Sequence, residues 1–202
     1  MKKSTHTIDM FLQQGEVYFG DRDTHIRTVL GSCVAITMWH PELLIGGMCH
    51  YMLPSRHPRG QRLHCRIRNS PIGFPSRRAP DTTTPDTTAL DGKYADEALV
   101  LMFAAIERSG TRAGEYQIKL FGGGNMFPAA TPRAHHVGLK NIAIVSQLLA
   151  HHDLKVSAEH LGGIGHRNLI FDIGTGHVWM QHQAPIEWPC DQCEMRKTCL
   201  HA

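Results

Sequence analysis

The chain has 202 residues, of which 42% are hydrophobic and 19% are charged, as in an ordinary globular domain. Its net charge of +3 is too small to predict nucleic-acid binding, and its longest uncharged apolar run, 98–106, is far below the ~20 residues of a membrane-spanning helix. Residues 1–14 do not resemble a signal peptide. We therefore expect a cytoplasmic protein whose six cysteines are thiols, ligands or a nucleophile rather than disulfides.

The first quarter of the chain is typical of β structure. Short strands are predicted at 16–20 and 26–30. Two apolar runs rich in β-branched residues follow at 33–39 and 45–52, separated by the turn-like sequence His40-Pro41-Glu42-Leu43. This spacing predicts a β-hairpin.

Residues 55–91 interrupt the pattern and predict a long surface loop. The segment holds many of the prolines, and 82–88 is nearly low-complexity. Its basic side chains either dock an acidic protein face or membrane surface or are simply solvated, and the sequence leaves both open. These side chains are Arg56, Arg59, Arg62, Arg66, Arg68, Arg77 and Arg78.

From residue 91 onward, helices and strands are both predicted. A helix is expected from Asp91, as its N-cap, to Ser109, and a second over 139–151. Further strands are predicted at 116–121, 155–160, 168–173 and 177–181. The fold class is therefore α/β of the α+β kind, a single-domain layered sandwich of mixed, largely antiparallel sheets with flanking helices.

The hairpin brings a cysteine and a histidine together. If its turn is centred between Pro41 and Glu42, Cys33 lies directly opposite His50, with their Cβ atoms ~5 Å apart. The preceding Gly31 lets the backbone bend, so that amides near Ser32 and Cys33 can bind an oxyanion. An adjacent imidazole is expected to lower the pKa of the thiol. On spacing alone, however, a buried structural cysteine and a satisfied core histidine are the commoner arrangement.

A series of motifs in a fixed order is more specific than this pair. Across residues 12–182 the chain resembles the chemoreceptor glutamine deamidase family, CheD. The resemblance is carried by Leu30-Gly31-Ser32-Cys33-Val34-Ala35, Gly46-Gly47-Met48-Cys49-His50-Tyr51-Met52-Leu53-Pro54, Tyr94-Ala95-Asp96, Phe121-Gly122-Gly123-Gly124-Asn125-Met126, Gly138 to Asn141, Leu161-Gly162-Gly163, Arg167, Phe171-Asp172 and Thr175-Gly176.

The resemblance implies an activity and a site. It implies deamidation of glutamines on the cytoplasmic helices of chemoreceptors, without a cofactor, on a fold similar to the catalytic domain of the cytotoxic necrotizing factor toxins. Cys33 matches the family's nucleophile and His50 its base. Thr28 is the nearest match for a threonine that orients the histidine. A CheC-type phosphatase is an implied partner.

Two other functions stay open at this point. The chain could be a non-catalytic adaptor that binds chemoreceptors or a CheC-type phosphatase, although binding alone requires neither Cys33 nor His50. It could also transfer the acyl group to an amine, because both enzymatic routes share a thioester and differ only in the access of water.

Three features outside the Cys33–His50 pair also bear on the function. Gly123 and Asn125 either border the cleft or form a turn in which asparagine tolerates positive φ. Cys49, next to His50, is expected on the opposite face of its strand as a buried thiol. The tail, 183–202, holds four thiol or imidazole groups that are spaced too tightly for an ordinary zinc site, so an unstructured tail is favoured over a metal site. They are Cys190, Cys193, Cys199 and His201.

Overall fold

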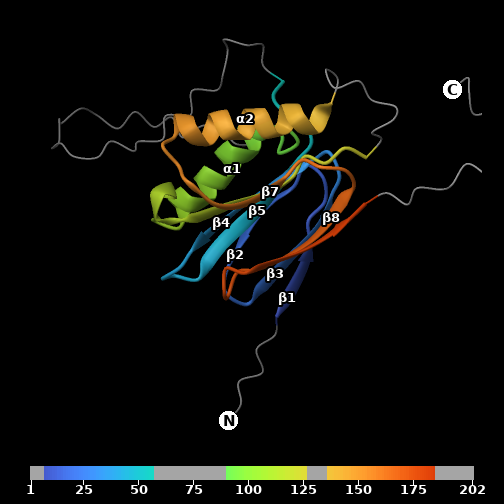
Figure 1. The fold of residues 1–202 in the computed structure, drawn as a ribbon. Coiled ribbons are helices and arrows are strands. Elements are labelled where there is room, and N and C mark those ends of the chain that lie inside the picture. Colours follow the sequence, from blue (N-terminus) through green and yellow to red (C-terminus); the bar gives the residue numbers. More distant parts are fainter. Residues whose placement is uncertain (1–6, 57–89, 127–135, 185–202) are drawn as a thin grey trace, which may run out of the picture.

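The computed structural model describes residues 7–56, 90–126 and 136–184. These residues form three layers: two α-helices, a five-stranded sheet and a four-stranded sheet (Figure 1). The helices cover one face of the five-stranded sheet, and the four-stranded sheet lies against the other. Most strand pairs are antiparallel, which confirms the predicted α+β class with mixed, largely antiparallel sheets.

The five-stranded sheet has β4 at its centre. Because both faces of this strand are covered, nearly every residue of Val34–His40 is buried, which explains its continuous apolar sequence. Among the strand pairs described for this sheet, the pair at one edge, β6 with β7, is parallel and the others are antiparallel. The strand order is β2 (Val17–Gly20), β5 (Ile45–Tyr51), β4 (Val34–His40), β6 (Gln117–Gly122) and β7 (Val156–Leu161).

The four-stranded sheet has one face toward the protein interior. Along β3 buried and more exposed residues alternate, as expected for a strand with one solvated face. The first strand, β1, was not predicted from the sequence, and it pairs in parallel with β3. The strand order is β1 (Ile8–Phe11), β3 (Thr24–Leu30), β8 (His166–Asp172) and β9 (Val178–Gln183).

Both predicted helices are present, with different beginnings. Helix α1 spans Ala95–Arg108 and its N-cap is Tyr94, so the expected N-cap at Asp91 is wrong. The Asp91 carboxylate instead accepts a hydrogen bond from the backbone N–H of Lys93, which completes a turn before the helix. Helix α2 spans Val137–His151, and the His136 side chain accepts from the N–H of Leu139 at its start.

Two apolar layers hold the sheets and helices together. The first lies between the helices and the five-stranded sheet and includes Cys49, as expected for a buried thiol on the face opposite His50. The second lies between the two sheets and includes Cys33, Met48 and Phe171. The functional residues predicted from the sequence therefore lie at the edge of the layer between the sheets.

The predicted register of the hairpin is wrong by two residues. Its turn occupies residues 41–44, and His50 lies opposite Ala35 rather than Cys33. The turn is centred one residue later than expected, between Glu42 and Leu43, which moves every partner by two positions. Because side chains alternate with a period of two, an even shift keeps Cys33 and His50 on the same face, as diagonal rather than direct neighbours.

Parts of the sequence lie outside the described residues. These parts include residues 57–89 of the predicted 55–91 loop, with Cys65 and all of its arginines except Arg56, and the tail with Cys190, Cys193, Cys199 and His201. Arg56 pairs with the buried carboxylate of Glu97, which also accepts from the N–H of Asp91, so one residue of α1 binds both ends of the loop. In the described parts of the chain, no helix is long and apolar enough to cross a membrane.

Candidate active site

Cys33 lies where the chain crosses from one sheet to the other. Strand β3 of the four-stranded sheet ends at Leu30, β4 of the five-stranded sheet begins at Val34, and residues 31–33 connect them. The Cys33 side chain faces the layer between the sheets and is 7% exposed. The crossing therefore places a thiol at the boundary between the protein interior and solvent.

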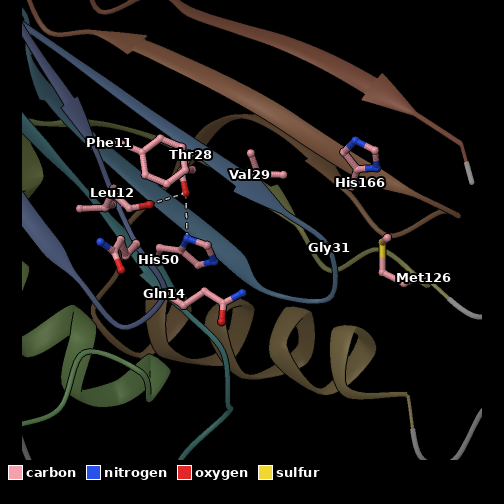
Figure 2. A pocket seen from close by; sticks show the side chains of 10 residues that line it. Phe11, Leu12, Gln14, Thr28, Val29, Gly31, His50, Met126 and His166 are labelled. Atoms are coloured by element: carbon pink, nitrogen blue, oxygen red, sulfur yellow. Dashed lines mark hydrogen bonds between the residues drawn. The ribbon is translucent and has the colours of Figure 1, made fainter.

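His50 is oriented by a threonine from the other sheet. The Nδ1 atom of His50 lies 2.8 Å from the hydroxyl of Thr28, and that hydroxyl donates to the carbonyl oxygen of Leu12, also at 2.8 Å (Figure 2). A threonine hydroxyl has a single hydrogen, so it must accept from the Nδ1–H of His50. This assigns the lone pair of the neutral imidazole to Nε2.

The Nε2 atom of His50 is free for chemistry. It is buried and has no hydrogen-bond partner among the described residues, Cys33 included. A buried nitrogen without a partner carries a cost in stability, which is typical of a functional atom that pairs only with substrate or during reaction. The backbone of His50 is held on both sides, by Gly15 donating to its carbonyl and its N–H donating to Glu16. The imidazole is therefore a rigidly held acceptor.

Burial controls the protonation of both groups. It lowers the pKa of His50 from 6.5 to about 4, against the smaller opposing effects of the Leu12 backbone and the Glu16 charge. Burial likewise raises the pKa of the Cys33 thiol, although the residue's own backbone N–H opposes the rise. The direction for the thiol is opposite to the lowering expected from the sequence, because desolvation outweighs the hydrogen bond from the residue's own backbone. At neutral pH the structure therefore holds a thiol and a neutral imidazole.

Residues 31–33 form the crossing segment, and each of their carbonyl groups accepts a hydrogen bond from another part of the chain. The carbonyl of Gly31 accepts from Gly124 at 2.8 Å and that of Cys33 accepts from Gly123 at 2.7 Å. The carbonyl of Ser32 accepts from the side chain of Asn141 at 3.0 Å. The N–H groups of Ser32 and Cys33 donate to no other residue within the described ranges. These are the amides that the sequence singled out for an oxyanion.

A cavity of about 780 Å³ opens beside these groups. His50 and Thr28 lie on one side of it, and Gly31 and Met126 on another (Figure 2). Cys33 itself is not one of its lining residues, but Gly31, two residues earlier, is. The lining residues are Phe11, Leu12, Gln13, Gln14, Thr28, Val29, Gly31, His50, Met126 and His166.

Gly123 and Asn125 do not line this cavity. Asn125 forms a parallel bridge with Ile164 and exchanges backbone hydrogen bonds with Gly163 and Gly165. The positive φ angles of this turn belong to Gly122 and Gly123 rather than to Asn125. Gly123 instead supports the crossing segment, because its N–H donates to the Cys33 carbonyl.

Sequence reasoning did not identify the segment that closes the site. Residues 11–14, at the end of β1 and in the connection to β2, contribute four of the lining residues, including Leu12, whose carbonyl positions Thr28. Backbone carbonyls and extended connections leave no mark in a residue pattern. In the described parts of the chain, no group of three His, Cys, Asp or Glu side chains is arranged to hold a metal ion.

The fold and the site define an α+β sandwich with a cysteine and a threonine-bound histidine between its sheets. The family model described as CheD chemotactic sensory transduction matches residues 78–182. Proteins named probable chemoreceptor glutamine deamidase CheD align over nearly the whole chain. The protein from Pseudomonas savastanoi pv. phaseolicola is 44% identical over 89% of this chain and 86% of its own length. CheD 3 of Dechloromonas aromatica is 41% identical over 85% and 86%.

A third relative, from Pseudomonas fluorescens, is 41% identical over 91% of this chain and 89% of its own length. The chain belongs to the CheD family. The family model begins after the predicted catalytic residues, but an alignment over 89% of the chain includes Thr28, Cys33 and His50 whichever end it omits.

Proposed function

We propose that this protein deamidates glutamine side chains on the cytoplasmic helices of chemoreceptors, with Cys33 as nucleophile, His50 as general base and Thr28 orienting His50. One observation carries the assignment of roles. His50 is held through Nδ1 by Thr28 and presents an unpaired Nε2 on the side of the sheet that also carries Cys33. A structural histidine in a core would have both nitrogens satisfied.

The first half of the reaction forms a thioester. As the Sγ atom of Cys33 attacks the carboxamide carbon of the substrate glutamine, its proton passes to Nε2 of His50. The resulting oxyanion binds the backbone N–H of Cys33, with Ser32 supplying a second amide. The imidazolium then gives its proton to the amide nitrogen, the C–N bond breaks and ammonia leaves.

The second half restores the enzyme. A water molecule gives a proton to Nε2 of His50 as its oxygen attacks the thioester carbon. The tetrahedral intermediate collapses, the C–S bond breaks and the proton returns to Cys33. The product is a glutamate side chain. Throughout both halves of the reaction the Nδ1–H of His50 stays hydrogen-bonded to the Thr28 hydroxyl, so Nε2 alone acts as base and acid in turn.

The activity is tested by incubating the protein with a purified chemoreceptor cytoplasmic fragment. We expect a mass gain of ~1 Da at each modified glutamine and one ammonia released per site. Added primary amine should not be incorporated; incorporation would identify acyl transfer instead. Binding of the fragment without any mass change would identify the non-catalytic adaptor and would contradict the proposal.

The pH dependence follows from the two shifted pKa values. His50 has to be neutral to act as base, and its pKa of about 4 keeps it neutral well below pH 6.5. The kcat/KM for deamidation should therefore stay level from neutral pH down to about pH 5 and fall only near pH 4. An unperturbed histidine would already have lost about nine-tenths of its neutral form at pH 5.5.

Alkylation of Cys33 by iodoacetamide supplies the second measurement, because it reports the thiolate directly. Since burial raises the pKa of the thiol, the alkylation rate should keep rising through pH 9 while deamidation is already level. An alkylation rate that is high and constant from pH 6 upward would indicate a thiolate–imidazolium pair and would contradict this protonation state.

We further propose that the protein acts in the cytoplasm, where the substrate helices of chemoreceptors lie, and that a CheC-type phosphatase is a partner. Support for the location comes from the proposed substrate and from the relatives named probable chemoreceptor glutamine deamidase. Support for the partner is family membership alone. Co-purification with a CheC-type protein from the same organism tests the second proposal.

A further inference from the structure

Asn141 is a buried polar residue to which the proposed chemistry gives no role. It lies in the second turn of α2 and has no exposed surface. Its Nδ2 donates to the Ser32 carbonyl at 3.0 Å and to the Met52 carbonyl at 2.8 Å, while Oδ1 is buried without a partner. A rotated amide would place Oδ1 against two carbonyl oxygens, so the orientation is unambiguous.

The bond to Ser32 sets the direction of the peptide that precedes the nucleophile. In a trans peptide the C=O and N–H groups point in opposite directions, and the described residues contain no cis bond. Asn141 draws the Ser32 carbonyl toward α2, so the N–H of Cys33 points away from the helix. That is the side of the sheet on which the Cys33 side chain lies, and this N–H also acts on the thiol pKa.

The three carbonyls of the crossing segment are not held equally. Those of Gly31 and Cys33 accept from the backbone amides of Gly124 and Gly123 and not from a side chain. Only the Ser32 carbonyl, in the same peptide as the Cys33 N–H, depends on a side chain. The direction of that N–H therefore depends on the identity of residue 141.

The second hydrogen bond of Asn141, to the Met52 carbonyl, connects the same side chain to the strand that carries His50. Met52 follows His50 by two residues, directly after β5. One amide group of Asn141 thus holds the chain beside the nucleophile and the chain beside the base. Asparagine is well suited to this position, because it offers two N–H donors on a short, neutral side chain, whereas Lys or Arg would bury a charge.

We propose that Asn141 is a positioning residue that aims the N–H of Cys33 at the oxyanion of the reaction. The inference rests on the proposed function, and it predicts a specific kinetic signature. Deamidation passes through an oxyanion, whereas alkylation of Cys33 by iodoacetamide displaces iodide directly and forms none. Removing Asn141 should therefore slow the first reaction and leave the alkylation rate of the ionised thiolate unchanged.

The test compares Asn141→Ala and Asn141→Leu with the unaltered protein. Leucine keeps the volume of the side chain and removes only its donors, so it protects against collapse of the site. We expect kcat for deamidation of a receptor fragment to fall about 10- to 100-fold in both variants, somewhat less than for deletion of an oxyanion donor. KM and the alkylation rate per thiolate, taken from a pH series, should stay within about twofold.

Tyr51→Phe is the matched control. The Tyr51 hydroxyl donates to the backbone carbonyl of Asn141 at 2.8 Å, so it anchors the same part of α2 to β5 without a hydrogen bond to the crossing segment. We expect this variant to lower the thermal unfolding temperature and to keep kcat. Equal losses of kcat in Tyr51→Phe and Asn141→Leu would mean that only the attachment of α2 matters, and would overturn the proposal.

Two other results would also overturn it. A parallel fall of deamidation and of the alkylation rate per thiolate in the Asn141 variants would mean that Asn141 maintains the overall structure of the site rather than the direction of one N–H. An unchanged kcat would remove it from catalysis. A failure of the proposed function is distinguishable from both, because the unaltered protein would then show no deamidation while its Cys33 still reacted with iodoacetamide.

Discussion

Replacing Cys33 by alanine is expected to abolish glutamine deamidation and to leave the fold intact. Without Sγ no thioester forms, and the remaining amides and His50 can only polarise the substrate. Turnover should fall by about 10⁴-fold or more, as it does when a covalent nucleophile is removed. The loss in stability should be only on the order of 1 kcal/mol, because one buried sulfur is lost from a small side chain. Mass analysis of the receptor fragment measures the turnover.

Cys49→Ala is the matched control for this substitution. Cys49 is equally small and fully buried, but it faces the helices rather than the layer between the sheets. It should keep full activity. Cys33→Ser replaces the sulfur atom with oxygen and keeps the shape of the side chain. It should be almost as inactive as Cys33→Ala, because a serine hydroxyl is a far weaker nucleophile beside a base of low pKa. A Cys33→Ala protein with the full rate would refute the assignment.

His50→Gln is expected to have the second largest effect. Glutamine retains polarity and size but accepts no proton, so both the attack and the release of ammonia lose their catalyst. We expect kcat/KM to fall about 10³-fold. The fall in rate near pH 4 should also disappear. Retention of that acid limb in His50→Gln would mean that another group is the base.

The same substitution should change the dependence of stability on pH. The pKa of His50 is about 4 in the folded protein and 6.5 as the reference value, so between these values the unfolded chain binds a proton that the native state does not. The original protein therefore loses stability as pH falls from 6.5 to 4, by on the order of 3 kcal/mol from this group. Denaturant unfolding of His50→Gln should lack that component.

Thr28 provides a matched pair of variants for the orientation of His50. Thr28→Ser retains the hydroxyl between Leu12 and Nδ1, whereas Thr28→Val has the same shape without it. Only the valine variant should reduce kcat, because the imidazole loses its fixed tautomer and leaves Nδ1–H unpaired. Equal activity in the two variants would show that the hydroxyl has no role in catalysis.

Local patterns in the sequence were sufficient for the elements and for part of the site. The apolar run of β4, rich in β-branched residues, indicated a strand of a hairpin, and two helices were predicted close to α1 and α2. The period of two along β4 and β5 placed Cys33 and His50 on one face. That conclusion survived the wrong register only because the error was an even number of residues.

By itself, the sequence determined the fold class, the same-face placement of Cys33 and His50 and, through its ordered motifs, the resemblance to the CheD family. Only the tertiary structure decided how these groups act. Thr28 orients His50 because the chain crosses between two sheets at residues 31–33 and brings β3 against β5, a contact between strands that no local pattern encodes. The direction of the thiol pKa was likewise decided by burial, because the cost of desolvating a charge depends on every neighbour that excludes water and not on the residue next in sequence.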